Sequence, residues 1–180
     1  MRIISGIYRG KILKPPKNFN ARPTTDFAKE SLFNILHNLI DIEQCKVLDL
    51  FAGTGSISYE FASRNALSIA SVEQNPAHYR YIHKTAGELG FETMHVIQSD
   101  AFGFILKPYE SFDIVFADPP FDHPRLKEIP DLVLESGILL PEGWFILEHP
   151  SEFQFRDFKG FYQQRTYGSV NFTLFQKTNT

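Results

Sequence analysis

The sequence has 180 residues, of which 43 % are hydrophobic and 22 % are charged. A chain of this length buries roughly 70 % of its unfolded surface, so one domain can hold a core without disulfides or structural metal ions. The single cysteine, Cys45, excludes an internal disulfide and has no His or Cys neighbour at metal-ligand spacing. The sequence also lacks an apolar leader and the roughly 18 apolar residues of a membrane span. We therefore expect a cytoplasmic monomer that binds neither metal nor membrane.

The net charge of −3 is distributed unevenly along the chain. Residues 1–30 carry seven basic and two acidic side chains, a local balance of +5, whereas the remaining 150 residues balance at −8. Such asymmetry is typical of a basic face that contacts phosphates. From charge alone, a solvated surface explains the pattern equally well.

The first forty residues predict a small hairpin followed by a helix. Residues 2–14 alternate short apolar pairs with glycines, as a hairpin does, and a loop follows to residue 23. A helix begins next, because Thr24, Thr25 and Asp26 are all good N-cap residues. Its apolar residues recur at helical spacing, at Ala28, Leu32, Ile35, Leu36, Leu39 and Ile40.

From residue 46 onward, predicted strands alternate with predicted helices. The strands cover 46–51, 68–73, 94–98, 113–118 and 143–149, and the helices between them cover 56–64, 76–90, a short stretch after 100 and a stretch from 130. Two aromatic-rich runs, 161–167 and 170–176, then predict a closing hairpin. The fold class is therefore α/β: a Rossmann-like, doubly wound, mainly parallel seven-stranded sheet with an antiparallel C-terminal hairpin. In such sheets, ligands bind at the carboxyl ends of the strands.

Two glycines, Gly53 and Gly55, follow the first predicted strand directly. A turn without side chains lets the backbone approach a ligand, and the helix that follows offers free N–H groups. The same turn fits a nicotinamide-binding fold, although the third glycine of that fingerprint would fall at Ser58. A tight turn with no ligand is the alternative interpretation.

Acidic residues follow the second and third predicted strands. Glu73 lies twenty residues after Gly53, where a carboxylate can accept hydrogen bonds from ribose hydroxyls of either NAD or S-adenosylmethionine. Asp100 could accept a hydrogen bond from an adenine amino group, while the N–H of Ala101 bonds a ring nitrogen. Asp100 could equally be the cap of the short helix that follows it.

The segment after the fourth predicted strand reads Asp-Pro-Pro-Phe and suits methylation of a base amino group. The lone pair of such a nitrogen is delocalised into the ring, so acceptors for both N–H protons are needed to turn it towards a methyl donor. Two prolines stiffen the turn that holds these acceptors, and the aromatic ring can stack on a flipped base. We assign the reaction centre to Asp118, Pro119, Pro120 and Phe121. His123 is a further candidate for substrate contact.

Over essentially its whole length, the sequence resembles the RsmD family, bacterial methyltransferases of a guanine N2 amino group in small-subunit ribosomal RNA. The resemblance is carried by residues 2–6, 9–10, 22–26, 30–34, 48–55, 73, 100 and 118–121, and the Arg-Pro-Thr-Thr segment at 22–25 is its most specific part. It implies S-adenosylmethionine as cofactor and ribosomal RNA as partner, within the small subunit or an assembly intermediate. It also implies an RNA-facing basic extension over residues 1–40 and a catalytic domain over residues 41–180.

The resemblance also implies roles for individual residues. Residues 118–121 would hold the target base. The residues implied in cofactor binding are Asp49, Phe51, Gly53, Gly55, Glu73, Asp100, Ala101 and Thr25. The residues implied in RNA binding are Arg9, Lys11, Arg22 and Thr24.

Three alternatives remain open at this point. A DNA adenine-N6 or cytosine-N4 methyltransferase uses the same Asp-Pro-Pro-Phe chemistry, but 180 residues leave little room for its usual target-recognition region. A nicotinamide-dependent oxidoreductase fits the glycines and Glu73 but does not explain residues 118–121. An RNA-binding fold without activity would keep the basic N-terminus and lose the cofactor residues, which are present here.

Overall fold

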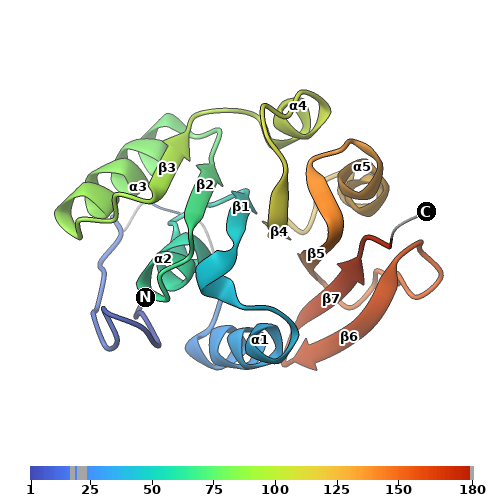
Figure 1. The fold of residues 1–180 in the computed structure, drawn as a ribbon, viewed down its shortest axis with the longest axis horizontal. Helices are drawn as coiled ribbons and strands as arrows, with labels where there is room; N and C mark the ends of the chain where they lie inside the picture. The colour runs from blue at the N-terminus through green and yellow to red at the C-terminus, as the bar shows by residue number, and fades with distance from the viewer. Residues whose placement is uncertain (17–18, 20–23, 179–180) are drawn as a thin grey trace.

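A seven-stranded sheet forms the centre of the computed structural model, which describes residues 1–16, 19 and 24–178 (Figure 1). The strand order is β3-β2-β1-β4-β5-β7-β6; β1 to β5 are parallel, and β7 pairs antiparallel with β5 and β6. The strands are β1 (Lys46–Leu50), β2 (Ser68–Val72), β3 (Met94–Ile97), β4 (Phe112–Ala117), β5 (Leu139–His149), β6 (Phe161–Tyr167) and β7 (Val170–Gln176). The predicted fold class is confirmed.

Helices cover both faces of the sheet, so the central strands are apolar on both sides. Val47 of β1 belongs to the core beneath α1, α2 and α3, whereas Leu48 and Leu50 belong to the core beneath α4 and α5. The helices are α1 (Asp26–Leu39), α2 (Ser56–Ser63), α3 (Pro76–Glu88), α4 (Ala101–Leu106) and α5 (Ile129–Glu135), with 3-10 turns at Ile42–Gln44 and Leu126–Glu128. None of the described helices is long and apolar enough to cross a membrane.

The structure differs from the predicted elements at two places. Strand β5 begins at Leu139, four residues earlier than predicted, because an irregularity absorbs Pro141: the register with β4 shifts there and Glu142 takes a φ of +60°. The predicted N-terminal hairpin is reduced, in the described part of the chain, to one antiparallel bridge between Arg2 and Ile12. Turns occupy most of the residues between the two bridge partners.

The N-terminal segment lies against α2 through a close backbone contact. Gly6 has a φ of +82°, and a Cβ atom there would lie 1.8 Å from the carbonyl oxygen of Ser63. The neighbouring Ile7 N–H donates to the same oxygen at 2.7 Å. Only glycine satisfies both requirements at position 6.

A buried ion cluster joins the N-terminal segment, α1 and α2. The Lys29 ammonium lies 3.0 Å from Glu60, and both side chains are at most 1 % exposed. Glu60 also pairs with Arg64 and accepts the Ile4 N–H at 2.8 Å, while Lys29 donates to the Arg2 carbonyl at 2.5 Å. Helix α1 shares its apolar core with α2 and α3. The domain boundary near residue 40 stays a prediction.

Candidate active site

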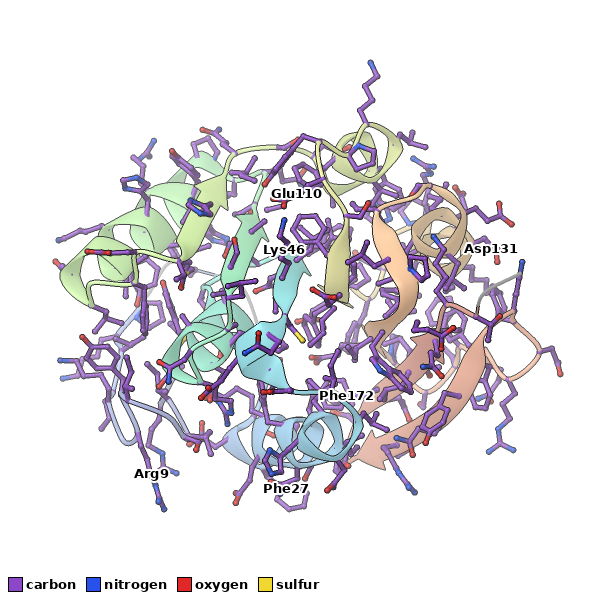
Figure 2. All side chains as sticks on the ribbon, viewed as in Figure 1. Arg9, Phe27, Lys46, Glu110, Asp131 and Phe172 are labelled. Carbon is purple, nitrogen blue, oxygen red and sulfur yellow. The ribbon has the colours of Figure 1, made fainter. Side chains whose placement is uncertain are left out.

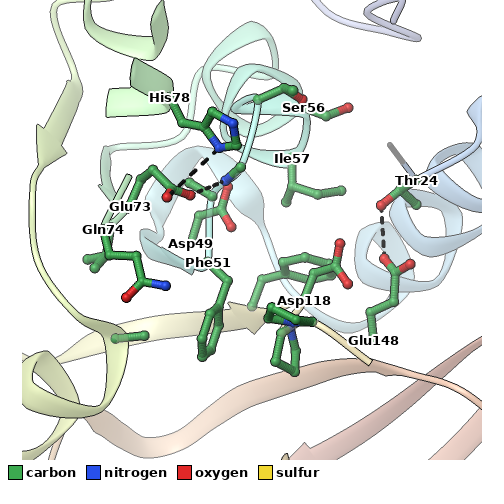
Figure 3. A pocket seen from close by; sticks show the side chains of 18 of the residues that line it. Thr24, Asp49, Phe51, Ser56, Ile57, Glu73, Gln74, His78, Asp118 and Glu148 are labelled. Carbon is green, nitrogen blue, oxygen red and sulfur yellow. Dashed lines mark hydrogen bonds and ion pairs between the residues drawn. The ribbon is translucent and has the colours of Figure 1, made fainter. Parts of the chain in front are cut away.

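A cavity of about 560 Å³ lies at the carboxyl ends of the parallel strands (Figure 3), within the size range of small-molecule sites. It brings together residues that are far apart in the sequence. Of the residues singled out from the sequence, those that line it are Thr24, Thr25, Asp49, Phe51, Gly53, Glu73, Ala101, Asp118, Pro119, Pro120 and Phe121.

The turn after β1 is held in an unusual backbone conformation. Phe51, Gly53 and Gly55 have φ values of +61°, +57° and +79°. Such a φ costs free energy for a bulky residue like Phe51, and strain of this kind is concentrated at functional sites. Gly55 does not line the cavity and directly precedes α2. A Cβ atom at position 55 would lie 2.8 Å from the ring of Tyr59.

Ser56, the first residue of α2, carries a buried, unsatisfied hydroxyl in the wall of the cavity. The residue is 8 % exposed and lines the cavity, and within the described part of the structure its Oγ has no hydrogen-bond partner. A hydroxyl beside the free N–H groups of a helix N-terminus is suited to an anionic group such as a carboxylate. Ser56 was not predicted as a binding residue, because its only signal in the sequence is its position at the start of the predicted helix.

Glu73 holds two backbone segments at the rim of the cavity. Its Oε2 accepts the Gly53 N–H at 2.8 Å and its Oε1 accepts the Asn75 N–H at 2.7 Å. His78 of α3 approaches the same carboxylate at 3.9 Å. Gln74, Asn75 and His78 line the cavity and were not predicted, although two of them directly follow Glu73. The carboxylate therefore fixes the shape of the glycine turn.

Asp100 acts as a helix cap in the structure. Its Oδ2 accepts the Gly103 N–H at 2.7 Å, so it is the N-cap of α4, and its side chain is exposed. Its neighbours Ser99 and Ala101 line the cavity, whereas Asp100 does not. The capping interpretation is confirmed, and cofactor binding by Asp100 stays a prediction.

Three acidic side chains, Asp49, Asp118 and Glu148, line one part of the cavity wall and interact electrostatically. Burial raises the pKa of Asp118 well above its usual value, and the charges of Glu148 and Asp49 raise it further. Burial likewise raises the pKa of Asp49 to about 7, although hydrogen bonds from the Ser58 N–H and hydroxyl, at 3.1 and 2.5 Å, oppose the shift. The site therefore favours a ligand that carries positive charge or donates hydrogen bonds.

Thr24 and Glu148 form a buried pair at the opposite end of the cavity from Glu73. The Thr24 hydroxyl donates to Glu148 Oε2 at 2.9 Å, and both residues line the cavity. Thr24, assigned to RNA from the sequence, is 7 % exposed and so lies within the cavity wall. Glu148 was not predicted, because it lies next to the last residue of an apolar strand, where an acid is easily taken for a solvated strand end.

Aromatic packing surrounds the loop that follows Pro120. The ring of His123 stacks on Phe102 with centroids 4.9 Å apart, and the Arg125 guanidinium lies 4.2 Å from the Phe102 ring centroid. His123 also contacts Phe51 edge-on. His123 is not among the residues that line the cavity. Its ring therefore supports the wall formed by Phe51.

The basic residues of the N-terminal segment lie outside the cavity. Arg9 and Lys11 are exposed, and Figure 2 shows Arg9 projecting from the rim of the molecule. Arg22 lies outside the described residues. Among the residues that the structure describes, no three or more His, Cys, Asp or Glu side chains are grouped so that they could hold a metal ion.

Comparisons with known proteins agree with this architecture. The chain matches the family described as "Conserved hypothetical protein 95" over residues 1–176. It is 36 % identical to ribosomal RNA small subunit methyltransferase D of Escherichia coli strain K12 over 152 residues, which cover 84 % of this chain and 76 % of the relative. The solved structure of the Escherichia coli protein yhhF is 31 % identical, with a TM-score of 0.87 and coverage of 100 % and 99 %.

A more distant structure shares the fold. An RNA methyltransferase from Salinibacter ruber, solved in complex with S-adenosyl-L-homocysteine, is 15 % identical, with a TM-score of 0.69 and coverage of 88 % of this chain and 95 % of that chain. At that identity the likeness concerns the fold alone.

Proposed function

The chain belongs to the RsmD family of S-adenosylmethionine-dependent ribosomal RNA methyltransferases, and from that premise we propose that it methylates the exocyclic N2 amino group of a guanine in 16S ribosomal RNA. The observation that carries the proposal is the cavity at the strand ends, in which Glu73 lies across from Asp118 (Figure 3). Gly53 and Phe121 line the same cavity. One cavity thereby offers a cofactor half and a base half.

The residues of the cofactor half fit S-adenosylmethionine. The unsatisfied hydroxyl of Ser56 and the N-terminus of α2 suit the carboxylate of its methionine part. Glu73 suits the ribose hydroxyls, and Ser99 with Ala101 lies where an adenine would be bound. The surrounding acids favour the positive charge of a sulfonium. When bound, S-adenosylmethionine supplies the methyl group as an electrophile, and its sulfur keeps the electron pair of the broken C–S bond.

Asp118 and the Pro-Pro turn orient the nucleophile. The Asp118 carboxylate accepts a hydrogen bond from the N2 amino group, which turns the nitrogen lone pair towards the methyl group. Formation of the N–C bond releases one amino proton, and Asp118, whose pKa is raised by burial, accepts it before it passes to solvent. Phe121 stacks on the flipped base. Rate enhancement therefore comes from positioning, without a covalent enzyme intermediate.

The RNA-facing surface is the basic N-terminal extension of residues 1–40. Arg9 and Lys11 are exposed there, on the segment that precedes Thr24 and Thr25 at the cavity. Cationic side chains of this extension neutralise phosphates of the RNA whose target nucleotide reaches Asp118. A single basic patch reads little sequence, so the shape of the small subunit or of an assembly intermediate supplies the remaining selectivity.

The test is methyl transfer from labelled S-adenosylmethionine to small ribosomal subunits that lack this modification, with the product nucleoside identified and mapped by mass spectrometry. We expect N2-methylguanosine at one position of 16S RNA. Labelling of DNA adenine or cytosine would contradict the proposal, as would a methylated nucleoside other than N2-methylguanosine. Equal rates on naked RNA and on subunits would disprove the role of the particle.

A further inference from the structure

Glu148 is a second acid at the base end of the cavity, and the reaction described above does not use it. Leu147 of β5 pairs with Ala117, the last residue of β4, so the next residues along the two chain segments are Glu148 of β5 and Asp118, which directly follows β4. Glu148 is 3 % exposed, yet both acids line the cavity. Figure 3 shows them together at one end of the cavity, across from Glu73.

Thr24 fixes the orientation of the Glu148 carboxylate. The 2.9 Å hydrogen bond from its hydroxyl reaches Oε2, and Thr24 is 7 % exposed. Thr25, the next residue, caps α1 by accepting the Ala28 N–H at 3.2 Å. The Glu148 carboxylate is therefore held by a buried residue that directly precedes the N-cap of α1.

Asp118 and Glu148 place two acids at one end of the cavity. Burial is the main cause of the raised pKa of Asp118, and the charge of Glu148 raises it further. A ligand that presents several adjacent hydrogen-bond donors would relieve this repulsion. Such an arrangement is typical of binding sites, where strain in the free protein is compensated when the ligand binds.

Guanine is the base whose edge matches two acceptors. Its N1–H lies directly beside its N2 amino group, so the edge presents adjacent donors. Adenine and cytosine place an unprotonated ring nitrogen beside their amino group, and that lone pair would face a carboxylate, which can only accept when ionised. A flipped base exposes this edge to the side chains of the pocket.

We propose that Glu148 accepts the N1–H of the target guanine while Asp118 accepts a proton of its N2 amino group, so that Glu148 selects guanine over adenine and cytosine. This inference rests on the proposed function and adds to it the residue that chooses the base. Thr24 is the positioning residue. A base without the N1–H would turn a ring-nitrogen lone pair towards the Glu148 carboxylate, where two acceptors face each other, so the site disfavours it.

The experiment compares guanosine with 2-aminopurine riboside at the mapped target position, introduced by ligation into RNA that is assembled into small subunits. The analogue keeps the 2-amino group but has an unprotonated N1. We expect the unmodified enzyme to favour guanosine by at least about 100-fold in kcat/KM. In Glu148→Gln the amide can donate to N1, so the preference should fall below about tenfold. Loss of the guanine O6 affects both enzymes and cancels in this comparison.

Glu152→Gln, an exposed acid four residues further along, is the matched control and should keep the original preference. If no N2-methylguanosine forms on guanosine RNA, the proposed function fails. Two outcomes on RNA whose guanosine is methylated would defeat only the assignment of Glu148. In the first, Glu148→Gln keeps the full preference for guanosine. In the second, Glu148→Gln loses activity on both bases equally while still binding S-adenosylhomocysteine. Should Glu148→Gln not fold, Thr24→Val tests the same ratio with the acid retained, and an unchanged ratio overturns the proposal.

Discussion

Asp118 is assigned to the target base and not to the cofactor, so its removal should affect kcat/KM for RNA and leave the affinity for S-adenosylmethionine nearly unchanged. In Asp118→Ala we expect kcat/KM for RNA to fall by at least about 100-fold, because the acceptor that orients the amino group is lost. Binding of S-adenosylmethionine, measured by calorimetry, should stay within about threefold of the unmodified protein, a difference of about 0.7 kcal/mol. Asp122→Ala, an exposed neighbour, is the control. A large loss of cofactor affinity in Asp118→Ala would reassign this residue.

Asp49 makes the stability of the ligand-free protein depend on pH. Burial raises its pKa from 3.8 to about 7, so its contribution to stability is complete below pH 3.8 and is lost as the pH rises towards 7. Asp49→Asn does not titrate. Its free energy of unfolding relative to the unmodified protein should therefore increase between pH 4 and pH 7, by at most about 4 kcal/mol, and then level off.

Urea denaturation across this pH range measures the effect of Asp49→Asn, with Asp131→Asn, exposed on α5, as the control. A stability difference that is the same at pH 5 and pH 8 would show that Asp49 is not the titrating group.

The sequence predicts a site residue where a motif marks its position. It does not predict residues that only the folded structure brings to the site. Glu73 and Asp118 stand at recognisable strand ends, and the structure brings both to one cavity. Glu148 carries no motif of its own, because its importance comes from Thr24, a neighbour distant in sequence. Ser56 is marked only by its position at the start of α2. One carboxylate after a strand fits either a ligand or a helix cap: Asp100 caps α4, and its role in cofactor binding stays a prediction.

At the scale of elements, the buried cluster of Lys29, Glu60 and Arg64 connects α1 and the N-terminal segment to α2. Glu60→Ala leaves the Lys29 ammonium buried without its carboxylate, so we expect a loss of about 3–5 kcal/mol in the free energy of unfolding. The exposed pair of Lys84 and Glu88 on α3 provides the control, and Glu88→Ala should change stability by less than about 1 kcal/mol. Urea denaturation measures both; equal losses would refute the role of burial.

The predicted elements followed the structure where hydrophobic pattern and turn residues agree. The closing hairpin was predicted at both boundaries, because aromatic alternation and the Gly168 turn point to the same register. Strand β5 was predicted too short, because Pro141 argues against a strand, and sequence alone does not reveal the irregularity that accommodates it. The N-terminal hairpin was overestimated, because its turns dominate a segment that tertiary contacts with α2 hold in place.

At the scale of the whole molecule, the basic N-terminal extension should control how RNA affinity depends on salt. Each phosphate contact contributes roughly 0.7–0.9 to the slope of log K against log salt concentration. The double variant Arg9→Ala with Lys11→Ala should therefore reduce that slope by about 1.5 without changing cofactor affinity. Filter binding to small-subunit RNA at several salt concentrations measures it, with Lys84→Ala on α3 as the control. An unchanged slope in the double variant would move the RNA surface elsewhere.

The position of β7 in the sheet has a consequence for how the protein is made. Strand β5, which carries Glu148, pairs with β4 along one edge. Its other edge pairs with β7, which is synthesised later. During translation β5 therefore emerges before its second neighbour and presents an unpaired apolar edge until residues 170–176 have been synthesised. An unpaired edge of this kind invites association with other chains. Nascent chains stalled between β5 and β7 are thus the species in which chaperone dependence should be greatest.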